Sequence, residues 1–267
     1  MRRNRWRLFA GAAVAVILAV QPATADDADT CAKAFSGDEA IAACTRLISS
    51  GRYNGRDLAI IYTNRGNAWG GDLDRPIADY AIRDYDQAIR LDPTYVPAYI
   101  KRGNAWGGKG DLDRAIADYT EVIRLDPTNA LAYYYRGYTW GAKGDNERAI
   151  RDYDQAIRLD PNARSYSVRC RAHAKAGNLP QALNDCDQAL RLRPNDTYTM
   201  SSRGFVYLRL GRLDDAIVEY DAAVKRSSST AFTLFGRGIA KQRKGDTAGP
   251  DRSRSAKRIT PSTSHSY

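Results

Sequence analysis

The sequence predicts an all-α fold in which antiparallel helix pairs stack into a solenoid after a cleaved signal peptide. A proline recurs at Pro93, Pro127, Pro161 and Pro194, at intervals of 34, 34 and 33 residues. Each proline ends a near copy of one phrase, IRLDP three times and then LRLRP. An RG pair and an aromatic residue precede the phrase, as in RGNAW and RGYTW. A fixed period of this length indicates repeated supersecondary units that bury their apolar faces on their neighbours.

Residues 1–25 have the layout of a secretory signal peptide. Four arginines precede an apolar run of 13 residues, Leu8–Val20, and Ala23-Thr24-Ala25 supplies small residues for cleavage. A membrane anchor is the alternative, but a spanning helix needs roughly 20 apolar residues. We therefore expect cleavage after Ala25 and export without a transmembrane anchor. The protein would be secreted, and periplasmic if its source is a Gram-negative bacterium.

The charge of the mature chain is mildly basic. Removal of the four signal-peptide arginines lowers the net charge from +10 to +6. Acidic and basic residues alternate in segments such as NERAIRDY, which is typical of a solvated helix surface. A nucleic-acid partner normally requires a basic face, so none is expected. Only Arg252–Arg258 is locally basic, and weak contact of this segment with anionic lipid or polysaccharide is the alternative function.

Residues 96–129 illustrate one repeat unit. The segment AYIKRGNAWGGKG has small and apolar residues at helical spacing, and DLDRAIADYTEVIRLDP follows with an apolar face at i, i+3, i+4 and i+7. Gly110 can end the first helix, and the side chain of Asp111 can cap the second. Pro127 then stops the second helix. Each unit is therefore expected to be an antiparallel helix pair.

These residues resemble the tetratricopeptide repeat, whose consensus has small residues at positions 8, 20 and 27, aromatic residues at 4, 11 and 24, and proline at 32. In 96–129 the matching residues are Tyr99, Gly103, Trp106, Ala115, Tyr119 and Pro127. The resemblance implies five units, at 59–95, 96–129, 130–162, 163–196 and 197–230. The fifth unit has Ser228 where proline is expected.

Both ends of the array depart from the pattern. Residues 26–58 resemble an irregular, shortened unit. Residues 231–245 resemble a sixth first helix, but the following GPDRSR offers no apolar face for a second helix. Because helical arrays need terminal caps, we expect 231–245 to serve as one. The polar and basic tail, 246–267, is expected to be disordered.

The four cysteines suggest two disulfides in an exported chain. Cys170 stands at the small position 8 of its unit and Cys186 at the aromatic position 24, so both lie on the packed faces of one helix pair. Cys44 occupies the equivalent of position 24 in the first unit, which makes Cys31 its expected mate. Four buried thiols acting as small apolar residues are the alternative.

No catalytic or cofactor motif is complete. GNAWGGKG nearly matches a phosphate-binding loop, but Gly110 replaces the required Ser or Thr and the segment lies at a helix end. The two histidines, His173 and His265, suggest neither a zinc site nor a catalytic triad. We expect a protein that is not an enzyme and has no cofactor and no metal.

A charge pair repeats with the units. Four arginines each stand 16 residues before an acid, which predicts a ladder of ion pairs between the two helices of a unit. Exposed pairs contribute little stability, so we expect the ladder to set helix register. The pairs are Arg102 and Asp118, Arg136 and Asp152, Arg169 and Asp185, and Arg203 and Glu219.

The resemblance also implies a ligand-binding face. In this family the first helices line a concave groove that takes peptides. The groove positions carry over to Thr63, Asn67, Ile100, Asn104, Leu131, Tyr134, Tyr138, Arg164, Ser167, Arg171, Lys175, Tyr198, Phe205 and Arg209, with Phe232 and Phe235 beyond them. We expect Asn67, Asn104, Tyr134, Tyr138, Arg171, Tyr198 and Phe205 to bind the peptide, since aromatic residues and arginine are favoured anchors. The alternative is that some of these aromatic side chains pack between units.

The combined expectation is a non-catalytic scaffold or adaptor in the cell envelope. It would bind a protein or peptide segment in its concave groove by docking alone.

Overall fold

The computed structural model describes residues 23–33, 37–69, 75–226 and 230–245, and the regular structure within these ranges is entirely α-helical. Most of the expected signal peptide and the whole expected tail lie outside the described residues. The helices are α1 (Ala25–Lys33), α2 (Asp38–Ser49), α3 (Gly55–Trp69), α4 (Arg75–Leu91), α5 (Val96–Lys109), α6 (Leu112–Leu125), α7 (Ala130–Lys143), α8 (Asn146–Leu159), α9 (Ala163–Ala176), α10 (Leu179–Leu192), α11 (Thr197–Arg209), α12 (Leu213–Lys225) and α13 (Ala231–Lys244).

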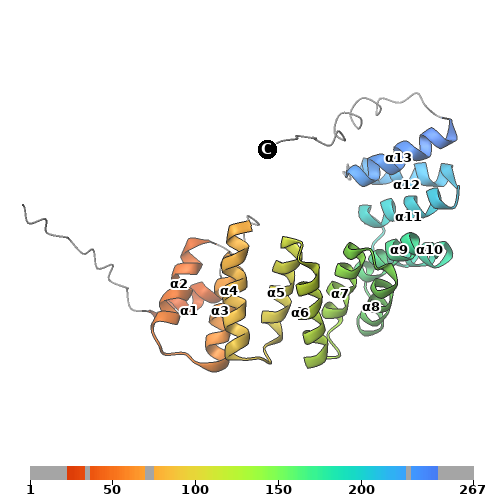
Figure 1. The fold of residues 1–267 in the computed structure, drawn as a ribbon. Helices are drawn as coiled ribbons and strands as arrows, with labels where there is room; N and C mark the ends of the chain where they lie inside the picture. The colour runs from red at the N-terminus through yellow and green to blue at the C-terminus, as the bar shows by residue number, and fades with distance from the viewer. Residues whose placement is uncertain (1–22, 34–36, 70–74, 227–229, 246–267) are drawn as a thin grey trace, which may run out of the picture.

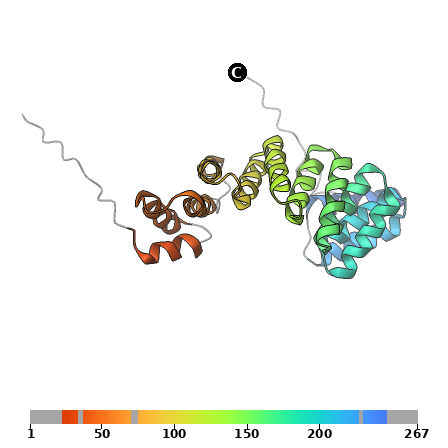
Figure 2. The same cartoon turned by 90° about the horizontal axis from the view of Figure 1, so that it is seen from below.

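The helices stack in chain order as antiparallel pairs. Figure 1 shows the pairs from α1 to α8 in a row and the helices from α9 to α13 turned upward as a second arm. Figure 2, from below, shows the same row leading into the more closely grouped helices of that arm. The predicted all-α solenoid is therefore confirmed, and its curvature leaves one hollow side between the two arms.

Local sequence signals separate the two helices of residues 96–129 as expected. Gly110 ends α5 in the left-handed conformation, with φ 83°, which a residue without a Cβ adopts at little cost. Asp111 then caps α6, because its side chain accepts a hydrogen bond from the backbone N–H of Arg114. Asp126 has φ −140°, outside the helical range, as a residue before proline prefers. The same turn recurs between α7 and α8 at Gly144 and Asp145.

A glycine and a tyrosine hold the two helices of a unit together. A Cβ built on Gly103 would lie 2.9 Å from the ring of Tyr119, and one built on Gly204 would lie 3.1 Å from Tyr220. At Gly103 an added Cβ would force the ring or the backbone to shift, and at Gly204 the ring would have to yield by a few tenths of an ångström. In the fourth unit a cysteine pair takes this place, with the Sγ atoms of Cys170 and Cys186 2.03 Å apart.

The N-terminal unit has a second cysteine pair. The Sγ atoms of Cys31 on α1 and Cys44 on α2 are 2.10 Å apart, the pairing expected from the sequence. Both side chains are buried with Leu47 and Ile61. The shortened unit is therefore closed by a cysteine pair, as the fourth unit is, in place of the glycine and tyrosine. The helix after it begins at Gly55, four residues before the expected unit boundary at 59, with Asp57 in its first turn.

The arginine ladder connects neighbouring units as well as the helices of one unit. Arg102 donates through Nε and Nη2 to Asp118 of its own unit, at 3.0 and 2.6 Å, and through Nη1 to Asp86 of the preceding unit, at 2.6 Å. Arg169 and Arg203 bridge two acids in the same way. Each of these guanidinium groups therefore fixes the register of three helices. The second acid was not predicted from the sequence.

Candidate functional site

Short hydroxyl side chains bring the first helices of the C-terminal arm together. The Oγ1 atom of Thr199 on α11 donates to the Oγ atom of Ser167 on α9 at 2.6 Å. Ser201 on α11 and Thr233 on α13 are joined at 2.8 Å. These side chains are buried, and their small size lets α9, α11 and α13 lie close together. The turned arm in Figure 1 is where these contacts occur.

Two residues expected to face the groove are buried instead. Ser167 is buried between α9 and α11, and Thr63 is buried on α3, where its hydroxyl donates to the carbonyl of Ala59. Neither side chain is available to a peptide. The consensus position places them on the first helix, but it does not reveal how closely the next first helix approaches.

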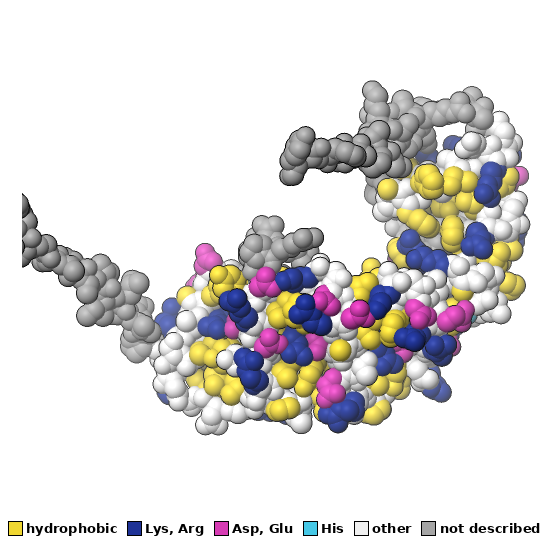
Figure 3. Space-filling view, viewed as in Figure 1, with side chains coloured by type: hydrophobic (Ala, Val, Ile, Leu, Met, Phe, Trp, Pro, Cys, Tyr) yellow, Lys and Arg dark blue, Asp and Glu magenta, His cyan; other side chains and the backbone are white. Residues whose placement is uncertain are grey.

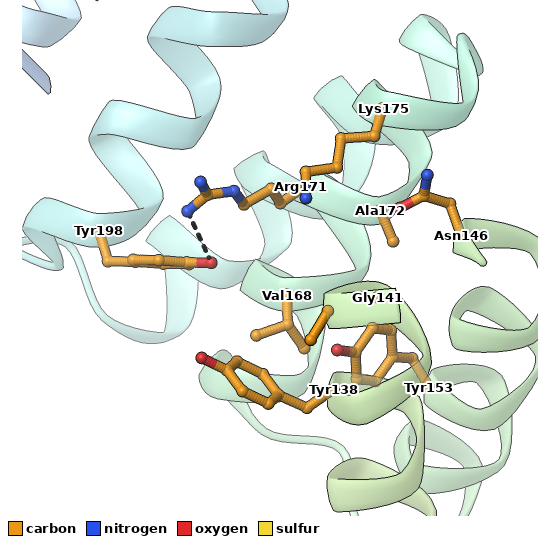
Figure 4. Close-up of a pocket in the computed structure, with 10 residues that line it drawn as sticks. Tyr138, Gly141, Asn146, Tyr153, Val168, Arg171, Ala172, Lys175 and Tyr198 are labelled. Atoms are coloured by element: carbon orange, nitrogen blue, oxygen red, sulfur yellow. Dashed lines mark hydrogen bonds between the residues drawn. The ribbon is translucent and has the colours of Figure 1, made fainter. Parts of the chain in front are cut away.

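Beside the hydroxyl contacts lies an open pocket of about 130 Å³. Four helices supply its lining: Tyr138 comes from α7, Tyr153 from α8, Arg171 and Lys175 from α9, and Tyr198 from α11. Figure 4 shows Arg171 extending from α9 toward Tyr198, with Tyr138 and Tyr153 on the α7 and α8 side of the pocket. Three of the expected peptide-binding residues, Tyr138, Arg171 and Tyr198, therefore meet at one site.

Aromatic groups hold the guanidinium of Arg171. Its Cζ atom lies 4.2 Å from the ring centroid of Phe232 and 5.4 Å from that of Tyr198. Its Nη1 atom donates to the hydroxyl oxygen of Tyr198 at 3.2 Å. Cation–π contacts of this kind contribute about 0.5–1 kcal/mol at exposed sites, more when desolvated. The charge is thus oriented by rings and a neutral hydroxyl.

Lys175 adds a second positive charge to the pocket. Burial lowers the pKa of its ammonium group, and the nearby charge of Arg171 lowers it further. The potential at this site is therefore positive. Figure 3 shows the surrounding pattern: dark blue and magenta side chains intermingle along the row of N-terminal units, whereas the upper arm shows mainly yellow and dark blue.

The remaining aromatic candidates divide into buried and exposed rings. Tyr134 is half-buried against Tyr153, with ring centroids 6.1 Å apart, and burial raises its pKa to about 12. Phe205 packs on the cluster around the fourth-unit disulfide and contacts Phe232, with centroids 5.8 Å apart. Both rings pack between units, the ring of Tyr134 also lines a second pocket with Leu131 and Arg164, and the role of both rings in peptide binding stays a prediction. Tyr138 is 57 % exposed and remains open to a ligand.

Asn67 and Asn104 lie away from this pocket. The Oδ1 atom of Asn67 accepts a hydrogen bond from the hydroxyl of Tyr85 at 3.1 Å, and that of Asn104 accepts one from Tyr119 at 2.7 Å. Each asparagine therefore binds the tyrosine that packs between the helices of its own unit. The structure does not bring them together with Arg171, and their role in peptide binding stays a prediction.

The floor of the pocket includes residues that the consensus did not single out. Val168 and Ala172 come from α9, and Asn146 and Tyr153 come from the second helix of the preceding unit. The sequence gives little indication that Tyr153 lines a pocket, because it stands at a position that is expected to lie in the core. Its ring does fill the core, and one edge also reaches the pocket.

Several other features bear on function. His173 lies with its Nε2 atom 3.9 Å from Asp185, and burial lowers its pKa, so it belongs to the packed interior of its unit. Within the described ranges, no group of three or more His, Cys, Asp or Glu side chains could hold a metal ion. None of the helices in the described part of the chain combines the length and apolar character that crossing a bilayer requires.

Comparisons with known proteins match the repeat pattern. A family model described as "Tetratricopeptide repeat" matches residues 78–130, 100–164, 141–197 and 168–232. Together these overlapping matches cover more than half of the chain. A search of curated proteins found no match.

Solved structures share the fold. The crystal structure of MamA superposes with a TM-score of 0.53 at 25% identity, covering 57% of this chain and 90% of MamA. YrrB, described as a TPR protein with an unusual peptide-binding site, gives 0.50 at 24% identity, covering 61% of this chain and 85% of YrrB. A tetratricopeptide repeat protein from Parabacteroides merdae ATCC 43184 gives 0.66 at 17% identity, covering 78% and 80%.

Proposed function

The chain belongs to the tetratricopeptide repeat family, and we propose that it is a non-catalytic scaffold that holds a protein or peptide segment against the hollow side of its C-terminal arm. The segment would lie across α7, α9 and α11. Binding requires docking alone, and no bond is made or broken.

One observation carries this proposal: the pocket where Tyr138, Arg171 and Tyr198 meet. Tyr138 and Tyr198 are 57 % and 41 % exposed, so both rings are accessible to a ligand. Exposed aromatic and arginine side chains that cluster in a concave site are the commonest energetic anchors of protein interfaces. A peptide-binding site is described for YrrB, whose fold this chain shares.

Site-specific photo-crosslinking in the native cell tests the proposal. A photoreactive residue is placed at position 138 or 171 in the pocket, or at Arg158, which is exposed on α8. We expect a discrete protein adduct from positions 138 and 171 and none from 158. Equal adducts from both faces, or none from the pocket, would refute docking at this site.

We also propose that the scaffold works in the cell envelope after export. Residues 1–25 support this through their signal-peptide layout, and the two cysteine pairs at disulfide distance support it because disulfides persist in oxidising compartments. Mass spectrometry of the protein purified from its host should find Asp26 at the N-terminus. An intact N-terminus or free thiols in the purified protein would contradict export.

A further inference from the structure

We propose that the pocket beside Arg171 selects segments that carry an acidic side chain close to an aromatic one. This inference rests on the groove function proposed above and adds the chemistry of the partner. It concerns the carboxylate of a side chain, as distinct from the carboxylate at the end of a chain.

The ladder arginines and the groove cations among the described residues have different partners. The ladder arginines are neutralised, as Arg102 and Arg169 each bind two carboxylates. Arg171 instead binds rings and a hydroxyl, and Arg209 donates to the backbone carbonyl of Ala174. Within the described ranges, none of the cationic side chains expected to face the groove forms an ion pair with a carboxylate. These side chains are Arg164, Arg171, Lys175 and Arg209.

A bound carboxylate would supply the negative charge that the lining of the pocket lacks. Arg171 has donors left after its single hydrogen bond to Tyr198, and the hydroxyl of Tyr198 can still donate its own proton. Lys175 carries an ammonium whose pKa is lowered by burial and by Arg171, so a nearby anion would relieve both penalties. Acidic side chains are absent from the lining of this pocket. The site therefore supplies donors and positive charge, and its lining holds no negative charge to balance them.

The other half of the pocket is apolar. Tyr138, Val168 and Ala172 line it next to the ring of Tyr153, and the whole pocket, including its charged half, has a volume of about 130 Å³. A cavity of about 150 Å³ can take a benzene-sized ring. An aromatic side chain is thus the group that best fills this space. Because both halves belong to one small pocket, the acidic and aromatic residues must be neighbours or next neighbours in the bound segment.

Peptide selection followed by affinity measurement tests this inference. A random peptide library, fused through its C-terminus and so lacking free terminal carboxylates, is selected on the mature chain and on the Arg171→Gln/Lys175→Gln variant. The control is Arg158→Gln on the exposed face of α8. We expect the mature chain and the control to enrich peptides with Asp or Glu beside an aromatic residue, and the double variant to lose the acidic preference.

A selected peptide, synthesised with an amidated C-terminus, then gives the size of the effect. Charge-assisted hydrogen bonds are strong enough that its affinity should fall about tenfold or more for the double variant. Replacing its acid with the corresponding amide should cause a similar fall, and Arg171→Lys should retain part of the affinity. Enriched peptides without acids, or equal affinity for the double variant, would overturn the inference and leave groove binding intact. The absence of any enrichment on the mature chain would overturn both.

Discussion

Replacing Arg102 with methionine tests the ladder that holds the units in register. The side chain donates three hydrogen bonds, two to Asp118 and one to Asp86. Asp118 is only 5 % exposed, whereas the side chain of Asp86 is 36 % exposed. Methionine keeps most of the apolar contact of the arginine stem, so the change isolates the lost charge.

The two acids should contribute very unequally to the cost. Loss of an exposed ion pair costs about 0–1 kcal/mol, which bounds the effect at Asp86. Removing one partner of a buried pair costs about 3–5 kcal/mol, because a desolvated charge is left behind. We therefore expect Arg102→Met to lower the free energy of unfolding by roughly 3–5 kcal/mol, nearly all of it through Asp118.

Urea denaturation measures this effect, and pH identifies its origin. Burial raises the pKa of Asp118 even with Arg102 present, and the variant should raise it further. The folded variant then holds a proton that the unfolded chain has lost, so its stability falls as pH rises. The loss of unfolding free energy caused by Arg102→Met should be larger at about pH 8 than at about pH 5.

Two variants serve as controls. Arg102→Met/Asp118→Leu should recover most of the stability, because it removes the stranded charge along with its partner. Arg124→Met breaks the exposed pair with Glu121 and should cost less than about 1 kcal/mol. A loss of stability for Arg102→Met as small as that for Arg124→Met, or one independent of pH, would refute this explanation of the ladder.

Three further predictions concern packing, the disulfide and the pocket. Gly103→Ala should destabilise the chain by about 1–3 kcal/mol, since its Cβ would press on the ring of Tyr119. Gly107→Ala on the same helix, where the added Cβ meets open space, should stabilise it by about 0.5–1 kcal/mol, and urea denaturation compares the two. Cys170→Ser/Cys186→Ser should cost about 3 kcal/mol, and a reducing agent should then destabilise this variant less than the wild type. Affinity for an acidic peptide should fall as pH rises through the lowered pKa of Lys175, because only the ammonium form attracts the carboxylate, and Lys175→Arg should abolish that fall in a binding titration.

The repeat pattern predicted the fold because the residues that begin and end each helix act locally within each unit. Gly110, Asp111 and Pro127 act through backbone conformation and capping, which depend on neighbouring residues in the chain. The cysteine pairs could be predicted for a related reason. Cys170 and Cys186 stand at two positions that meet in every unit, so the repeat itself supplied the distance information.

The second half of the arginine ladder could have been predicted as well. Asp84 and Asp86 form a DYD phrase, and Asp152 and Asp154 form another, with the first acid facing its own unit and the second facing the next. The phrase looks like ordinary helix-surface charge. Its role appears only when two adjacent units are placed together.

The candidate site was predicted only in part, because it depends on the spacing between units. The consensus positions correctly placed Tyr138, Arg171 and Tyr198 on first helices. They did not predict that Ser167 is buried. That burial arises because the short hydroxyl side chain lets α9 and α11 approach. Curvature is a property of successive interfaces, and a single repeat does not encode it.

A crystal structure of the mature chain with a selected peptide bound would show whether the pocket beside Arg171 is the binding site. We expect an extended peptide across α7, α9 and α11, with a carboxylate within hydrogen-bond distance of Arg171 and a ring against Tyr138. A peptide bound on the outer face formed by α8 and α10, or one that leaves Arg171 on Tyr198 and Phe232 without a new partner, would contradict it.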